Sequence, residues 1–283
     1  MLQNRRGFLS TLGGAAAGLA VRPGALGALV WPERRTRLDK VGIQLYTLRR
    51  VAQTDLPGTL AQLGKIGYKE IEFAGYYNRP PTEVRDILKA NGLTAPSTHV
   101  GVNVIEQTPD KLFEESRIVG HEWITVPSLP SGPKATVDDW KRIADQFNRA
   151  AAHVKEAGFR FAFHNHNAEF KKIGDAVPLE ILIKETDPAL VSYEMDIYWV
   201  VNGGGNPLDL IARYPGRFKM LHVKDSAGPP DHKMVEVGAG TIDFKTIFAK
   251  AKGIEHYFVE HDQPADPIAS ATASFNYLNS LSF

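Results

Sequence analysis

The chain has 283 residues, no cysteine, and a nearly even balance of 33 basic and 32 acidic side chains. A chain of this length folds as one large domain or two small ones, and without a concentrated basic surface it is a poor candidate for binding nucleic acid. The lack of cysteine excludes disulfides and thiolate metal sites, so any transition-metal site must be built from His, Asp and Glu.

The first 28 residues differ from the rest of the chain. Arg5 and Arg6 precede a weakly apolar stretch, TLGGAAAGLA, and then a run of small residues, GALGA. This order resembles a twin-arginine export signal. We therefore predict a signal segment over 1–28, cleaved near Gly27 or Ala28, and a periplasmic or otherwise exported protein with no stable membrane anchor after cleavage. An amphipathic N-terminal helix of the fold is the alternative.

Short apolar runs alternate with amphipathic stretches from residue 38 to the end. The runs predict strands over 41–47, 68–73, 93–99, 123–128, 160–166, 190–196, 218–225 and 257–262, and the stretches predict helices over 55–66, 80–91, 109–120, 136–158, 175–186, 206–214, 242–252 and 266–281. Eight such pairs predict an α/β fold with a single (β/α)₈ TIM barrel over 38–283. A doubly wound open sheet is the alternative, but no Gly-rich phosphate loop follows the first strand.

Several predicted strands end with polar residues on one face and apolar residues on the other. In a barrel, alternate residues of each strand face the interior, and active sites form at the carboxyl ends of the strands. Buried carboxylates that met there would repel one another and would be costly to desolvate, and a divalent cation would offset both effects. The polar pairs are Glu70 and Glu72, Ser97 and His99, His164 and His166, Glu194 and Asp196, and His222 and Lys224, with Glu260 on the last strand.

Six motifs resemble those of the sugar phosphate isomerase/epimerase family, whose members are xylose isomerase-like TIM barrels. They are VGIQLYTLR, FAFHNHNAEF, YEMDIYWV, LHVKD, VGAGTIDF and FVEHD. The resemblance implies one divalent metal ion, most often Mn²⁺ and otherwise Mg²⁺, Co²⁺, Fe²⁺ or Zn²⁺. It implies four side chains from the fifth to eighth strands as the ligands: His164, Asp196, His222 and Glu260.

The sequence departs from the family pattern at two of these motifs. Many members carry a glutamate where this chain has His164, and that glutamate forms an acid/base pair with the one corresponding to Glu260. The resemblance therefore leaves Glu260 as the main catalytic candidate, with His166 or Lys224 to handle a second proton. Trp199 stands near a position where the sugar epimerases often place a histidine. The predicted substrate-binding residues are Glu72, His99, Glu194, Trp199 and Glu169, and Glu169 is also a candidate for orienting a histidine.

The predicted chemistry is proton abstraction next to a carbonyl of a sugar or keto-sugar, which gives an isomerase or an epimerase. Loss of a β-substituent after the same proton abstraction would give a keto-glycoside lyase. A non-catalytic exported sugar-binding protein and a DNA-repair endonuclease on the same barrel are further alternatives, although export and the charge balance argue against the endonuclease. The expected partner is a small carbohydrate, free, oxidised or glycosidic, and the sequence leaves the oligomeric state open.

Overall fold

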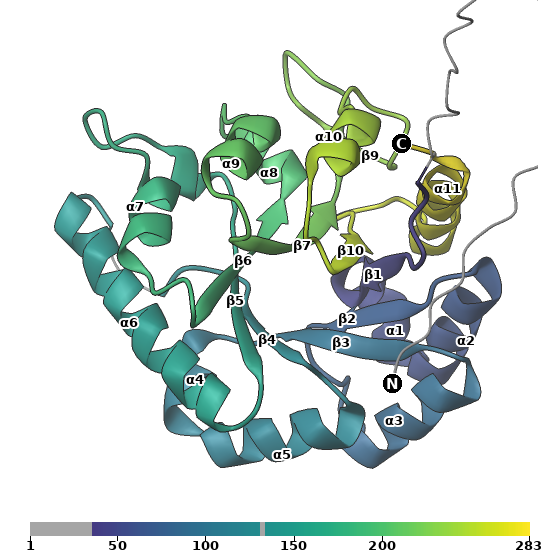
Figure 1. Cartoon of the computed structure of the whole chain (residues 1–283). Helices are drawn as coiled ribbons and strands as arrows, with labels where there is room; N and C mark the ends of the chain where they lie inside the picture. The colour runs from purple at the N-terminus through teal and green to yellow at the C-terminus, as the bar shows by residue number, and fades with distance from the viewer. Residues whose placement is uncertain (1–35, 131–133) are drawn as a thin grey trace, which may run out of the picture. The chain divides into compact units, whose positions relative to one another are not determined.

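The computed structural model describes residues 36–130 and 134–283, which form a closed barrel of eight parallel strands (Figure 1). Around the barrel the order is β1-β10-β7-β6-β5-β4-β3-β2. Their bounds are β1 (Gly42–Gln44), β2 (Glu70–Phe73), β3 (Thr94–His99), β4 (Trp123–Val126), β5 (Arg160–His164), β6 (Val191–Asp196), β7 (Phe218–Val223) and β10 (His256–Val259). The predicted TIM barrel is confirmed, and β1 closes it by pairing with both β2 and β10.

Every helix predicted from the sequence is present on the outside of the barrel. These helices are α2 (Leu56–Ile66), α3 (Pro81–Ala90), α5 (Pro109–Val119), α6 (Val137–Glu156), α7 (Pro178–Glu185), α9 (Pro207–Arg213), α10 (Phe244–Lys250) and α11 (Pro267–Ser280). In α6, Thr136 and Asp139 form a capping box, which satisfies backbone donors at the start of the helix. The apolar face of α6 then brings Phe147 against Phe161 and Phe163 of β5.

Shorter elements that the sequence did not reveal lie mainly at the carboxyl ends of the strands. They are the 3₁₀ turns η1 (Leu45–Leu48) and η2 (Ala168–Phe170), the helices α1 (Arg49–Thr54), α4 (Val102–Gln107) and α8 (Ile197–Asn202), and the hairpin strands β8 (Asp225–Ser226) and β9 (Met234–Val235). The predicted signal segment 1–28 lies outside the described residues and stays a prediction. Within the described part of the chain, no helix is long and apolar enough to span a membrane.

The barrel interior changes from apolar to polar along the strands. Trp123, Ala162, Met220 and Phe258 form a separate buried cluster, which we call the plug. Arg160 covers the plug, with its guanidinium carbon 3.7 Å from the centre of the Trp123 ring. Two residues farther toward the carboxyl ends, Ala162, Met220 and Phe258 are followed by the titratable residues His164, His222 and Glu260. The register aligns His164 with Glu194 and Asp196 with His222. The fold therefore places the polar strand ends at one mouth.

Candidate metal centre and active site

Four buried side chains from neighbouring strands meet at the mouth, and we call them the mouth cluster: His164, Asp196, His222 and Glu260. His164 Nε2 lies 3.2 Å from Asp196 Oδ2, and His222 Nδ1 lies 2.8 Å from Glu260 Oε2. One nitrogen or oxygen atom from each residue lies within 4.8 Å of the others. A two-histidine, two-carboxylate set suits a divalent transition metal, so these residues fit the ion that the sequence predicted.

Hydrogen bonds on the far side of both imidazoles leave the correct nitrogen free for an ion. His164 Nδ1 lies 3.3 Å from the carbonyl oxygen of Pro127, and His222 Nε2 lies 2.6 Å from Glu72 Oε2. When an ion is bound, each imidazole keeps one N–H, and these acceptors hold it on His164 Nδ1 and His222 Nε2, so that His164 Nε2 and His222 Nδ1 face the ion. Outer partners of this kind are typical of metal-binding histidines.

Asp196 is held in place by two neighbouring elements. Its Oδ1 accepts a hydrogen bond of 2.9 Å from the Trp199 backbone N–H and so caps the first turn of α8, which leaves Oδ2 facing the cluster. The Asn165 side chain accepts from the Asp196 N–H at 3.1 Å and donates to its carbonyl at 3.4 Å. Asn165 was not among the site residues predicted from the sequence. Its contact with Asp196 depends on the pairing of β5 with β6.

Lys224 is a fully buried cation beside the cluster. Its Nζ lies 2.7 Å from Glu260 Oε2, 3.0 Å from Asp196 Oδ2 and 2.9 Å from Asp262 Oδ1. Burial opposes the charge, but Asp196, Glu260 and Asp262 together raise the pKa of Lys224 well above its ordinary value. Lys224 is therefore an ammonium group. An ionised carboxylate has about four lone-pair sites, so Asp196 and Glu260 can accept from Lys224 and still bind an ion.

A second group, the deep quartet, lies on the other side of the His222 ring and consists of Glu72, His99, Glu194 and His222. His99 Nε2 lies 2.8 Å from Glu194 Oε2 and 3.1 Å from Glu72 Oε2. Burial opposes a charge on His99, but the two glutamates raise its pKa to about 9. Glu194 Oε1 is buried without a hydrogen-bond partner among the described residues. Of the deep quartet, only His99 lines the adjoining pocket, so substrate contact by Glu72 and Glu194 stays a prediction.

The remaining predicted site residues differ in how they contact the pocket and the mouth cluster. His166 lines the pocket, and burial and His164 lower its pKa to about 3, so its ring is neutral. Glu169 is buried and accepts a 2.9 Å hydrogen bond from the His166 backbone N–H. It thus contacts the backbone of a histidine and not its ring. Trp199 packs against the His166 ring, with centroids 5.6 Å apart, and Lys224 Nζ lies 5.8 Å from the Trp199 ring centre.

A pocket of about 520 Å³ opens over the mouth cluster. His164, His166, Lys224 and Glu260 line its floor and sides. Sequence analysis missed Tyr46, which also lines the pocket, is 42 % exposed, and stacks beneath the Arg49 guanidinium at 3.9 Å. An exposed aromatic ring beside a polar pocket provides a surface for the apolar face of a sugar. The aromatic residue of QLYTLRR was the available signal.

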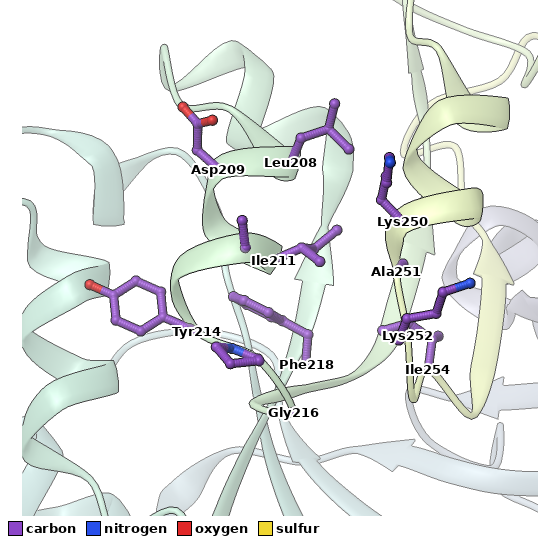
Figure 2. Close-up of a pocket in the computed structure, with 12 residues that line it drawn as sticks. Leu208, Asp209, Ile211, Tyr214, Gly216, Phe218, Lys250, Ala251, Lys252 and Ile254 are labelled. Atoms are coloured by element: carbon purple, nitrogen blue, oxygen red, sulfur yellow. The ribbon is translucent and has the colours of Figure 1, made fainter.

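A second cavity lies in the outer layer of the barrel between α9 and α10 (Figure 2). Its volume is about 550 Å³, and Leu208, Ile211, Phe218 and Ile254 give it an apolar lining. It shares no residue with the mouth cluster or with the deep quartet. Size alone therefore does not distinguish the two cavities, whereas the titratable residues mark the one at the mouth as the candidate active site.

Comparisons with known proteins find the same barrel fold. A sugar phosphate isomerase/epimerase from Parabacteroides distasonis is 30 % identical in its solved structure, with a TM-score of 0.75 over 85 % of this chain and 93 % of that one. An inosose dehydratase from Geobacillus kaustophilus is 23 % identical over 80 % of this chain and 90 % of its own length. The IolI protein, solved with a zinc atom, shares the fold at 15 % identity and a TM-score of 0.67, over 84 % of this chain and 95 % of its own.

The family model described as "Xylose isomerase-like TIM barrel" matches residues 60–280, a span that contains the whole mouth cluster and the deep quartet. The relatives named above include an isomerase/epimerase and a dehydratase, so this is an enzyme family. The chain belongs to the xylose isomerase-like TIM barrel family.

Proposed function

We propose that this protein is a divalent-metal-dependent enzyme that removes a proton next to the carbonyl of a keto-sugar or keto-cyclitol and then eliminates a β-substituent. The observation that carries the proposal is the Lys224 ammonium, which touches the Glu260 carboxylate at 2.7 Å on the pocket floor. A base and an acid are thus adjacent, whereas His164 takes the place of a second carboxylate.

The mouth cluster would hold the ion through His164, Asp196, His222 and Glu260. When bound, a divalent ion polarises a substrate carbonyl and stabilises the negative charge that develops on its oxygen. The outer hydrogen bonds to Pro127 and Glu72 keep both imidazoles in the geometry that this requires.

The residues of the chain account for each proton. Glu260 takes the proton from the carbon next to the carbonyl, and the electron pair of that C–H bond forms the enolate. When the carbonyl re-forms, the bond from the β-carbon to its oxygen substituent breaks, and Lys224 donates a proton to the departing oxygen. A hydroxyl substituent thus leaves as water. The 2.7 Å contact then returns the proton from Glu260 to Lys224 and restores both groups.

The same arrangement argues against epimerisation by two glutamates. Inversion at carbon needs a base on one face of the substrate and an acid on the other. Here Glu260 and Lys224 lie side by side, with 2.7 Å between Glu260 Oε2 and Lys224 Nζ, so base and acid meet the same face of the substrate. The relative named inosose dehydratase supports elimination, while the isomerase/epimerase neighbour keeps isomerisation as the second candidate.

Proton exchange and elimination can be measured separately. We would incubate the metal-loaded protein in D₂O with a panel of keto-sugars and keto-cyclitols, and follow deuterium uptake and the unsaturated product. Glu260→Gln should abolish both signals. Lys224→Met should keep deuterium uptake and lose product formation by about 10²- to 10⁴-fold, because it removes only the acid.

Lys219→Met is the matched control, because Lys219 lies on β7, the strand that directly precedes Lys224 in the chain, but pairs with Glu255. It should leave both signals unchanged. Deuterium uptake with an isomerised or epimerised product would favour the second candidate. No uptake with any compound of the panel would overturn proton abstraction and favour a sugar-binding protein.

We also propose export of this enzyme to the periplasm, on the strength of Arg5 and Arg6 and the apolar stretch after them. The substrate would then be a free, oxidised or glycosidic sugar derivative. Replacing both arginines by lysine should retain the protein inside the cell in a fractionation experiment. Unchanged distribution of this variant would contradict twin-arginine export.

A further inference from the structure

Glu72 is a fully buried carboxylate surrounded by donors. It accepts hydrogen bonds from Gln44 Nε2 at 2.8 Å, from Ser97 Oγ at 2.5 Å and from His222 Nε2 at 2.6 Å. His99 Nε2 lies a further 3.1 Å from the same carboxylate. Every close partner of this carboxylate thus carries a hydrogen-bond donor, and an ionised carboxylate is the form that accepts from all of them.

The barrel register fixes Glu72 in this place. Glu72 is paired with Gln44 of β1 and with Ser97 of β3, so both neighbouring strands supply a donor. The third donor comes from His222, which lies across the barrel on β7. Because the backbone holds its partners on either side, the carboxylate has little freedom to move away from His222.

We propose that Glu72 is a positioning residue that sets the tautomer of His222 for the mouth cluster. His222 Nε2 is closer to Glu72 Oε2, at 2.6 Å, than to Glu194 Oε2, at 3.2 Å. With the hydrogen on Nε2, the lone pair of His222 lies on Nδ1, which faces Glu260 Oε2 at 2.8 Å and Asp196 Oδ2 at 3.9 Å. Glu72 thus acts through His222.

An alternative is that the deep quartet binds a second ion, with Glu72 as one of its ligands. Glu72 Oε2, the oxygen on the side of the deep quartet, already lies close to Gln44 Nε2, His222 Nε2 and His99 Nε2, which take up its roughly two lone-pair sites. An ion there would also need the Nε2 lone pair of His222, while the mouth cluster needs the lone pair on Nδ1. The hydrogen-bond pattern therefore favours the positioning role.

The chain provides a matched control two residues earlier on the same strand. Glu70 is also buried and also contacts a histidine, with its Oε2 2.8 Å from His256 Nδ1. Lys40 is its other partner, and neither His256 nor Lys40 belongs to the mouth cluster. Glu70→Gln and Glu72→Gln therefore make the same chemical change at two buried glutamate–histidine pairs.

The experiment measures Mn²⁺ affinity and stoichiometry by equilibrium dialysis. Glu72→Gln should weaken binding by about 10- to 100-fold, the usual effect of losing an outer partner of a metal ligand, while Glu70→Gln should change it less than about twofold. Both variants should show cooperative thermal unfolding, which establishes that they fold. Equal affinity in the wild type and Glu72→Gln would overturn the proposal. Two ions in the wild type and one in Glu72→Gln would show that Glu72 is a ligand.

The ring of His222 gives a second, spectroscopic readout. Long-range ¹H–¹⁵N spectra of the Zn²⁺-loaded wild type should show the His222 proton on Nε2, and Glu72→Gln loaded to the same occupancy should change the Nε2 signal. An unchanged His222 spectrum would overturn the proposal. The inference rests on the proposed ion site, but the two fail differently: a wild type that binds no divalent ion contradicts the proposed function, whereas a wild type that binds one ion with a Glu72→Gln variant of equal affinity and unchanged spectrum contradicts only the role of Glu72.

Discussion

The plug and the mouth cluster occupy the same barrel and share strands β5 and β7, yet their chemistry is opposite. On β5, Ala162 belongs to the plug and His164 to the cluster, and on β7 the same step separates Met220 from His222. A two-residue step along a strand keeps a side chain on the inner face and moves it toward the mouth. One layer closes the barrel with apolar contacts, and the next gathers charges that are costly to bury.

This comparison indicates that the residues that stabilise the barrel and the residues that would bind the ion occupy different layers along the strands. Changes in the plug should lower the free energy of unfolding and leave the ion site intact. Changes in the mouth cluster should remove ion binding with a smaller cost to stability, because residues chosen for function are rarely optimal for stability. The predictions below test whether stability and ion binding can be changed independently, in order of decreasing expected effect.

The largest effect is expected for His222→Ala. His222 is shared by the mouth cluster and the deep quartet, so its removal takes one ligand from the ion and one donor from Glu72. We expect loss of divalent metal from the purified protein and loss of turnover, measured by elemental analysis and by product formation. A variant that keeps one full equivalent of metal would show that His222 is not a ligand.

Phe258→Ala tests the plug. Phe258 is fully buried beside Trp123, Ala162 and Met220, and truncation of such a ring typically costs about 3–5 kcal/mol of unfolding free energy. We expect this loss in urea denaturation, with Mn²⁺ affinity of the folded variant unchanged within about threefold. Loss of affinity comparable to that in His222→Ala would mean that the two layers are not separable.

His121 sharpens the comparison because it is buried among neutral partners. Its Nδ1 lies 2.6 Å from the Ala95 carbonyl and its Nε2 lies 2.8 Å from the Tyr76 hydroxyl. Burial lowers the pKa of His121 to about 4, whereas the carboxylates around His222 overcome burial and raise the pKa of that residue. The neutral ring of His121 thus stabilises the fold fully above about pH 6.5, and this contribution is lost as the pH falls toward 4.

The predicted size of that loss is about 3 kcal/mol, because each unit of pKa shift corresponds to about 1.4 kcal/mol. Denaturation midpoints measured between pH 7 and pH 4 should show it, and His121→Gln should flatten this part of the profile. A variant with the same pH profile as the wild type would assign the acid sensitivity to other groups.

His164→Glu should have the smallest effect on ion binding. The substitution keeps a ligand atom in the cluster but adds a second carboxylate, so we expect Mn²⁺ affinity within about tenfold of the wild type. It should also raise deuterium exchange relative to elimination, because a second base becomes available. An unchanged ratio of exchange to elimination would show that residue 164 does not choose between the reactions.

The sequence was informative wherever a strand period decided the answer. The alternation in FAFHNHNAEF predicts His164 on the inner face of its strand, and the structure places His164 at the pocket, while Phe161 and Phe163 pack against Phe147 of α6. The period does not give the depth of a residue or its partners across the barrel. The surroundings of Glu72 depend on contacts with β1, β3 and β7, which only closure of the barrel brings together.

Other features were not predicted from the sequence because they lie in short elements whose sequence patterns are weak. α8 begins directly after β6, and Asp196 serves both as its cap and as a member of the cluster. The sequence IYWVVN has no helix-start signal that stands out before it, so residues 197–202 were assigned to no predicted element. Tyr46 lies in η1, a single 3₁₀ turn, whereas the predicted strand over 41–47 included this residue.

The most direct test of the central claim is anomalous diffraction from crystals soaked in Mn²⁺. The account predicts one strong peak, surrounded by His164 Nε2, Asp196 Oδ2, His222 Nδ1 and Glu260 Oε2. A peak among Glu72, His99 and Glu194, or no peak in the barrel mouth at all, would contradict it.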